Sequence, residues 1–503
     1  MISPSRTHHR SHRRRHSVRP KETTREPMAT AVSLVGILIL GLLAEMPWLA
    51  RSVRAHLLQV IVVAIVALIG VCAGRATRVT ARDLLQGASP WLLAVLAWAV
   101  LLTLFPPSRS FHVSQLLAPF ALSELLRLIF CFGVYYAAAY CLRTNEIAIV
   151  IVGVLIVGSL IAFYAMYQYA TGTDNISTSS IFGNHEQSGS YIMLLLLVPL
   201  SVAISRTSGF RMQTIGQVFA LVLAAALLLM RTRSAWLGAL VGVLVMLGLH
   251  LRYNTQKLTG ANRFLLVGPL LIVAFAFVAM VSSDSLGSLV SERATTMSKW
   301  TDDASFGDRI RRWHAACVMT RERPVAGWGL GSFPVLQEGF THQGDPPDYV
   351  LKFGTGHSNL AHNYYVQWAA ETGCIGLFLY VGAMFAGLFS LISLAHRLNQ
   401  DGMAPFLGCA AALAASIADM VGAPSYTFPG ASALPFLWMG LGVTIARTSS
   451  SHAHRHRSDA RQEEPETVIV QPPLKISTPI WVHTASAGIA LLAVAAVMWA
   501  GRR

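Results

Sequence analysis

The chain has 503 residues, of which 54% are hydrophobic and only 13% are charged, and its mean hydropathy is +0.52. Because an ordinary soluble domain carries about 25% charged residues, this composition excludes a soluble globular protein and indicates one that lies in a membrane. The formal net charge of +15 would also suit a nucleic-acid-binding protein, but the basic clusters fall where membrane topology already requires them, so we expect no nucleic-acid partner.

The apolar runs predict an all-α fold, a polytopic transmembrane helical bundle. A run of about 20 apolar residues crosses the hydrocarbon core of a bilayer, and we expect about 12 core spans and one extra C-terminal span. No cleavable signal peptide is expected, because the basic start leads directly into a full-length span. The predicted spans are 29–49, 57–73, 90–105, 123–141, 147–169, 189–204, 215–230, 235–250, 264–282, 362–395, 404–421, 431–447 and 479–500.

These spans set the order of the parts of the chain. The parts are a basic disordered cytoplasmic tail at 1–28, transmembrane helices within 29–282, an external loop with helices at 283–361, further transmembrane helices within 362–447, a basic, histidine-rich cytoplasmic linker at 448–478 and the additional span within 479–503. We expect the basic tail and linker to contact anionic membrane lipids. Their histidines would also suit metal capture, but a disordered polar segment is the simpler interpretation.

Lysine and arginine in the short connections predict the orientation. Basic residues concentrate at the start of the chain and in the connections that an even number of spans separates from it, which are 74–83, 205–213, 251–263 and 448–478. Since such loops stay in the cytoplasm, the connections 106–122, 170–188, 231–234, 283–361 and 422–430 should face outside. Arg51 and Arg54 are an exception on the outer side.

The external loop 283–361 is much longer than an ordinary connection, and such loops are usually functional. A helix should begin at Ser305, acting as N-cap, and end near Arg323, because Pro324 disfavours helical geometry before it. The glycine-rich segment 327–331 should then form a tight turn. Arg309 and Arg312 are three residues apart and therefore neighbours on one face of that helix. They would either rest on lipid phosphates or clamp a diphosphate, which guanidinium binds through paired hydrogen bonds.

A second arginine pair, Arg231 and Arg233, lies between two apolar runs that only about four polar residues separate. The pair is therefore held at the membrane surface. Snorkelling to headgroups is common for arginine at helix ends, but arginine is less expected on the outer side, which favours a role in anion binding.

Polar residues also gather before two of the later spans. Asn184 and His185 would either bind sugar hydroxyls or cap a helix start. Asn363 is a further candidate for binding a sugar or the acceptor. It also begins a stripe with Gln367 and Glu371 that should face the bundle interior, since unpaired polar groups are costly in lipid.

His362 is the most informative residue, because imidazole is the side chain best suited to proton transfer near neutral pH. Glu371 is nine residues away and on the opposite helix face, so the two are not predicted to pair. Asp419 is expected near the outer surface, where an arginine would be its partner. The cysteines form no predicted framework, and a bridge between Cys317 and Cys374 is not favoured.

The order of these motifs resembles the O-antigen ligase and polymerase superfamily of bacterial inner-membrane glycosyltransferases. The resemblance covers roughly residues 180–445 and rests on the segments 232–238, 307–313, 323–333, 362–365 and 371–377. It implies that Arg233 is the family's arginine between two spans, Arg309 its loop-helix arginine and His362 its loop-end histidine; Arg231 and Arg312 have no mapped counterpart. The family often has a second Asn after the Gly-Asn pair where this chain has Glu186, which weakens an acceptor-binding role for that turn.

The resemblance also implies a reaction. A polyprenyl diphosphate-linked glycan is the donor, and a lipid or glycan acceptor supplies a hydroxyl at the outer face of the cytoplasmic membrane. His362 would be the general base, the arginines would stabilise the diphosphate leaving group, and the anomeric carbon would invert. No metal and no cofactor are expected, because arginines carry the charge.

The acceptor stays open among lipid A core (ligase), the growing glycan (polymerase) and a protein hydroxyl. The non-enzyme alternative is a lipid-linked glycan flippase or exporter, which should hold its polar groups near the membrane midplane.

Overall fold

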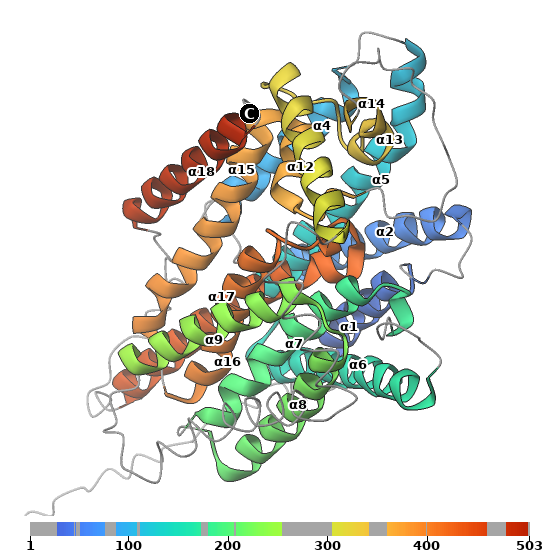
Figure 1. Cartoon of the computed structure of the whole chain (residues 1–503). Helices are drawn as coiled ribbons and strands as arrows, with labels where there is room; N and C mark the ends of the chain where they lie inside the picture. Colours follow the sequence, from blue (N-terminus) through green and yellow to red (C-terminus); the bar gives the residue numbers. More distant parts are fainter. Residues whose placement is uncertain are drawn as a thin grey trace, which may run out of the picture.

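The computed structural model describes residues 28–44, 46, 51–75, 87–107, 111–172, 180–205, 208–253, 304–341, 360–398, 400–459 and 479–500, and these residues form helices and no strands. The prediction of an all-α bundle is confirmed (Figure 1). The longer helices are α1 (Met28–Leu43), α2 (Arg51–Arg75), α4 (Ser89–Leu104), α5 (Phe111–Tyr136), α6 (Thr144–Thr171), α7 (His185–Ile204), α8 (Phe210–Leu229), α9 (Arg233–Tyr253), α12 (Ala304–Glu322), α15 (Tyr364–Leu394), α16 (Gln400–Asp419), α17 (Pro429–Asp459) and α18 (Ile480–Ala500).

Within the described part of the chain, nine helices are long and apolar enough to cross a membrane. Three shorter apolar helices, Ala29–Leu43, His56–Val71 and Ser89–Leu104, coincide with the first three predicted spans. The other predicted spans each coincide with one long helix, except 264–282, which lies outside the described residues. The protein is therefore a multi-pass membrane protein.

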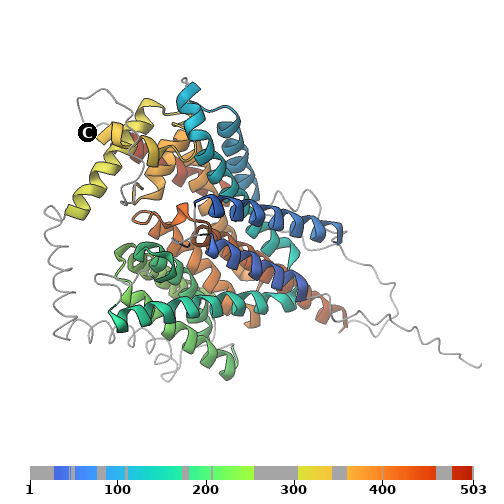
Figure 2. The same cartoon turned by 90° about the vertical axis from the view of Figure 1, so that its right-hand side faces the viewer.

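The centre of the bundle is α7, whose run from Tyr191 to Val198 is buried on every side. A helix that is apolar all round is stable only when other helices surround it. The helices α8, α9 and α16 pack against α7, and α17 packs against both α5 and α16. Figures 1 and 2 show this central packing from two directions. The start of α7 is consequently held in place by several neighbours.

The long helix α15 is interrupted at Gly373, which has φ 71° and ψ −174°. The interruption frees backbone groups that a helix would pair, and the segment after α12 pairs them instead. Trp328 N donates to Ala370 O (3.0 Å), Gly329 N donates to Glu371 O (2.9 Å), and Cys374 N donates to Pro324 O (2.7 Å). The predicted turn at 327–331 is present, with positive φ at each of its three glycines. This pairing fixes α12 and its turn to the first half of α15.

Several boundaries differ from the prediction. The helix α12 ends at Glu322 as expected but begins at Ala304, so Ser305 lies inside it instead of capping it. The outer connection predicted at 106–122 is shorter, because α5 begins at Phe111 and accommodates Pro119 within the helix. The linker predicted from residue 448 begins as a continuation of α17, which runs to Asp459. The tail 1–27 and residues 460–478 lie outside the described part.

The additional C-terminal helix α18 packs along α15 and also touches α12 (Figure 1). Trp91 Nε1 in α4 donates to His483 Nδ1 in α18 (3.1 Å), and the rings of Phe389 and Trp481 lie 5.9 Å apart. It is therefore part of the bundle. Cys317 and Cys374 are both free thiols, as the spacing indicated.

Candidate functional site

His362 lies immediately before α15 and has a positive φ of 53°. A left-handed backbone conformation costs a non-glycine residue about 1–3 kcal/mol, and such strain persists only where neighbouring contacts impose it. Asn363 is the N-cap of α15, and its Oδ1 accepts from Tyr365 N (3.1 Å) and Val366 N (3.3 Å). Tyr364 N donates to Met420 O (2.8 Å) at the end of α16.

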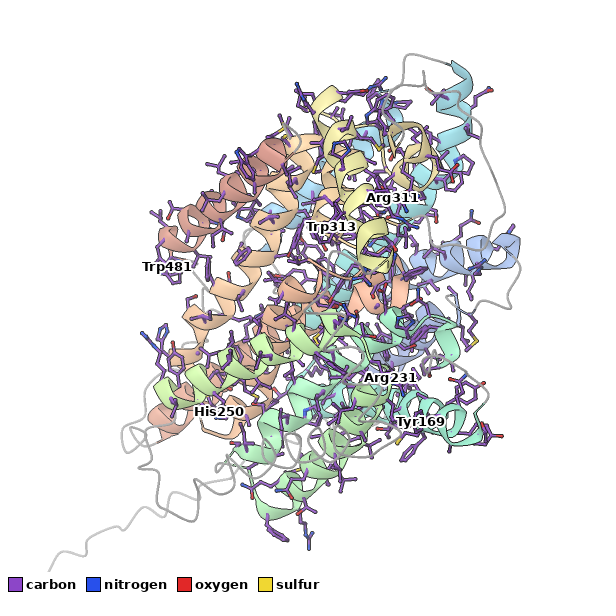
Figure 3. The ribbon with its side chains drawn as sticks, in the orientation of Figure 1. Tyr169, Arg231, His250, Arg311, Trp313 and Trp481 are labelled. Carbon is purple, nitrogen blue, oxygen red and sulfur yellow. The ribbon has the colours of Figure 1, made fainter. Side chains whose placement is uncertain are left out.

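Two side chains of α12 hold the backbone that precedes the histidine. Arg312 Nη1 donates to Leu360 O (3.0 Å), and Trp313 Nε1 donates to Ala361 O (2.7 Å). The amide of Ala361 in turn donates to Gln367 Oε1 (3.2 Å) in α15. Trp313 and the exposed Arg311 project to different sides of α12 (Figure 3). These contacts account for the strained conformation, and they give Arg312 a positioning contact that the sequence did not indicate.

Glu186, the second residue of α7, brings the predicted base and one predicted cation together. His362 Nδ1 lies 2.8 Å from Glu186 Oε2, and Arg309 Nη2 forms an ion pair with Glu186 Oε1. The side chains of Glu186, His362 and Arg309 are 7%, 15% and 26% exposed, so the cluster opens toward Arg309. Residues far apart in the sequence thus meet on one carboxylate.

The turn that carries the second arginine pair lies against the start of α7. Thr232 Oγ1 donates to His185 O (2.9 Å), and a Cβ on Gly189 would lie 2.7 Å from that hydroxyl oxygen, so only glycine fits there. Arg231 has a positive φ of 52° in this turn, and Arg233 begins α9. Arg231 is marked at the turn in Figure 3. Both arginines are half-buried beside the segment that carries Glu186.

Asn184 caps α7, with its Oδ1 accepting from Glu186 N (2.8 Å). Of the two predicted roles for this turn, the structure therefore supports helix capping by Asn184. His185 is half-buried next to it. Asn363 caps α15 in the same way, and the stripe that it forms with Gln367 and Glu371 is buried, as predicted.

Below the site lies a buried polar layer that sequence reasoning missed. Arg127 of α5 is 3% exposed, and it donates to Tyr426 O (2.7 Å) and to the Tyr364 hydroxyl (2.9 Å) while pairing with Glu124. Because a charged residue inside an apolar span is costly, its presence in the span was itself a signal of a polar contact. Asp419, for which an arginine partner was expected, instead accepts from the Tyr426 hydroxyl (3.0 Å).

The geometry thus combines a histidine, a carboxylate and arginines at the starts of α7, α9 and α15 and in α12. In a comparison with protein-family models, residues 218–381 match the family described as O-antigen ligase. This segment belongs to the O-antigen ligase superfamily. No curated protein matches the chain.

The O-antigen ligase segment holds Arg231, Arg233, Arg309, Arg312 and His362. The carboxylate that joins Arg309 to His362 belongs to Glu186 on α7, which precedes the matched segment. The site is therefore assembled from the matched segment and from an earlier helix of the bundle.

Proposed function

We propose that this protein is an integral-membrane glycosyltransferase that moves a glycan from a polyprenyl diphosphate carrier to an acceptor hydroxyl at the outer face of the cytoplasmic membrane. One observation carries the proposal: His362 and Arg309 contact the two oxygens of the same carboxylate. A group that accepts a proton and a group that stabilises a departing diphosphate are thereby held side by side.

The reaction is a single displacement. The acceptor oxygen attacks the anomeric carbon while His362 removes the hydroxyl proton, and the bond from that carbon to the diphosphate oxygen breaks. The electron pair leaves with the diphosphate, and the configuration of the anomeric carbon inverts. A general base of this kind contributes about 10²–10⁴-fold in rate.

The arginines stabilise the charge that grows on the diphosphate. Arg309 presents a fork of N–H donors, of which Nη2 is bonded to Glu186. Arg231 and Arg233 belong to the turn between α8 and α9 and the start of α9, and Thr232 between them contacts the start of α7. Arg312 contributes mainly by holding Leu360. Because fixed cations act where charge develops, they supply the stabilisation for which a metal ion is otherwise used.

The acceptor is a hydroxyl of a lipid, of the growing glycan or of a protein. Asn184 and Asn363 position their helices, so His185 is the remaining candidate of that group for a sugar contact. A flippase or exporter is less well supported. The residues that the proposal uses lie at the starts of α7, α9 and α15 and in α12, whereas a transporter binds its cargo near the midplane.

The proposal is tested with purified protein, a synthetic polyprenyl diphosphate disaccharide as donor, and lipid A core, lipid-linked glycan and a hydroxyl-bearing peptide as acceptors. His362→Ala should lower the release of polyprenyl diphosphate by at least about 100-fold while donor binding is kept. His396→Ala is the control and should be unchanged, because this exposed histidine lies in the 3₁₀ turn after the far end of α15. Transfer should continue in excess EDTA.

A fully active His362→Ala variant would refute the assignment of His362 as the general base. Loss of turnover in EDTA that Mg²⁺ or Mn²⁺ restores would overturn the arginine-only stabilisation of the leaving group.

A further inference from the structure

We propose that Glu186 is a positioning residue that fixes the proton of His362 on Nδ1 and couples the base to Arg309. This inference rests on the proposed function and assigns a role that neither the family match nor the sequence motifs contain. The observations that carry it are the 2.8 Å contact between His362 Nδ1 and Glu186 Oε2 and the ion pair between Arg309 and Glu186 Oε1.

The first step concerns the tautomer of the histidine. An ionised carboxylate has acceptors only, so a hydrogen bond to it requires that Nδ1 carry the proton. In a neutral imidazole the lone pair then lies on Nε2. Glu186 therefore presents Nε2 as the atom that takes the acceptor's hydroxyl proton. When the proton arrives, the carboxylate stabilises the imidazolium without being protonated itself, as in other carboxylate–histidine pairs.

The second step concerns the charge of the carboxylate. The Glu186 side chain is only 7% exposed, and a buried carboxylate is costly unless it is paired. Arg309 supplies the positive partner at Oε1 while His362 occupies Oε2. The same side chain thus places the proton acceptor and the cation for the leaving group at a fixed separation, which is the preorganisation that catalysis requires.

The third step is that Glu186 is itself held from both sides. Its amide donates to Asn184 Oδ1 (2.8 Å), and its carbonyl accepts from Ser425 Oγ (3.2 Å) in the turn before α17. The preceding carbonyl, that of His185, accepts from Thr232 Oγ1 (2.9 Å). Since Glu186 lies in the first turn of α7, the helix dipole also favours its negative charge. Side chains from two other turns therefore fix the backbone that carries this carboxylate.

The test is the variant Glu186→Gln, which keeps the size of the side chain. If its amide oxygen stays with Arg309, its NH₂ group faces Nδ1 and donates to it, which moves the imidazole proton to Nε2. We expect kcat for release of polyprenyl diphosphate from the disaccharide donor to fall by about 10²–10⁴-fold, with the donor KM within about threefold of wild type. Glu186→Asp, which keeps the charge, should recover part of the loss. Glu322→Gln, an exposed carboxylate on α12, is the control.

A double-mutant cycle separates positioning from a general structural role. If Glu186 acts through the histidine, adding Glu186→Gln to His362→Ala should cause no further loss of turnover. An additional loss of tenfold or more would overturn the proposal, as would a Glu186→Gln variant with wild-type kcat. If Glu186→Gln has wild-type kcat while His362→Ala is inactive, the positioning role fails and the proposed function still stands. The failure of one can therefore be distinguished from the failure of the other.

If Glu186→Gln does not accumulate as folded protein, the Glu186→Asp variant is used to test the positioning role. Its shorter side chain breaks the 2.8 Å contact with Nδ1, so a lowered kcat with an unchanged donor KM is expected. Wild-type kcat, or a donor KM that rises as far as kcat falls, would overturn the positioning role.

Discussion

The break in α15 offers a sharp test of how the site is assembled. Gly373 has φ 71° and ψ −174°, a combination that is essentially confined to glycine. A Cβ at this position would lie 2.2 Å from Val325 O and 2.4 Å from Val325 C. Both are backbone atoms of the segment that follows α12, so they cannot turn aside as a flexible side chain can. Gly373→Ala must therefore push this segment away from α15.

The structure allows the effect to be estimated. The unfavourable backbone conformation costs about 1–3 kcal/mol for a residue with a Cβ. Displacing the segment also weakens the hydrogen bonds of Trp328 N, Gly329 N and Cys374 N across the break, each worth about 0.5–1.5 kcal/mol. A total of roughly 2.5–7.5 kcal/mol follows, which is well above the effect of an ordinary substitution.

The assay is chymotryptic cleavage after Trp328, a residue that is only 7% exposed in the intact structure. If Gly373→Ala lowers the free energy of local opening of this segment by the estimated amount, cleavage should be at least about 100-fold faster. Glycan transfer should also fall, because the displaced segment no longer fixes α12. The control is Gly488→Ala in α18, where a Cβ meets nothing within 4 Å. Equal cleavage rates in the two variants would refute the conclusion that the break in α15 holds the segment after α12 in place.

Two further predictions follow from the placement of α12. Arg309→Lys keeps the charge but loses the planar fork, so transfer should drop well over tenfold, since one such donor is worth on the order of 3 kcal/mol. The control is Arg321→Lys in the exposed last turn of α12, which should retain most activity. Equal effects at both positions would favour anchoring of the helix to lipid headgroups. Val325→Cys, at a position that is 60% exposed, should react with a membrane-impermeant thiol reagent in intact spheroplasts, because the external loop is predicted to face outside. Burial raises the pKa of the Cys317 thiol to about 11, so this natural cysteine should compete poorly, and labelling of Val325→Cys in lysed vesicles alone would reverse the proposed orientation.

The sequence by itself determined the class of fold and most of its elements. The thickness of a bilayer sets the length of an apolar run that crosses it, so the spans in the described part of the chain could be predicted without knowledge of their packing. The end of α12 before Pro324 and the tight turn at 327–331 were also predictable, because proline and glycine restrict or free the backbone locally. The motif order likewise indicated the O-antigen ligase family, which the match over 218–381 supports.

The tertiary structure alone decided which side chains meet. Glu186 is 123 residues from Arg309 and 176 from His362, and its neighbours in sequence indicated only a helix start. Ser305 was expected as a cap and lies inside α12, because local signals fix a helix start less firmly than packing does. Arg312 was predicted either to rest on lipid phosphates or to clamp a diphosphate, and only the fold showed that its Nη1 donates to the carbonyl of Leu360. Periodicity gives the face on which a residue lies, whereas its partner depends on how helices distant in sequence pack around the start of α7.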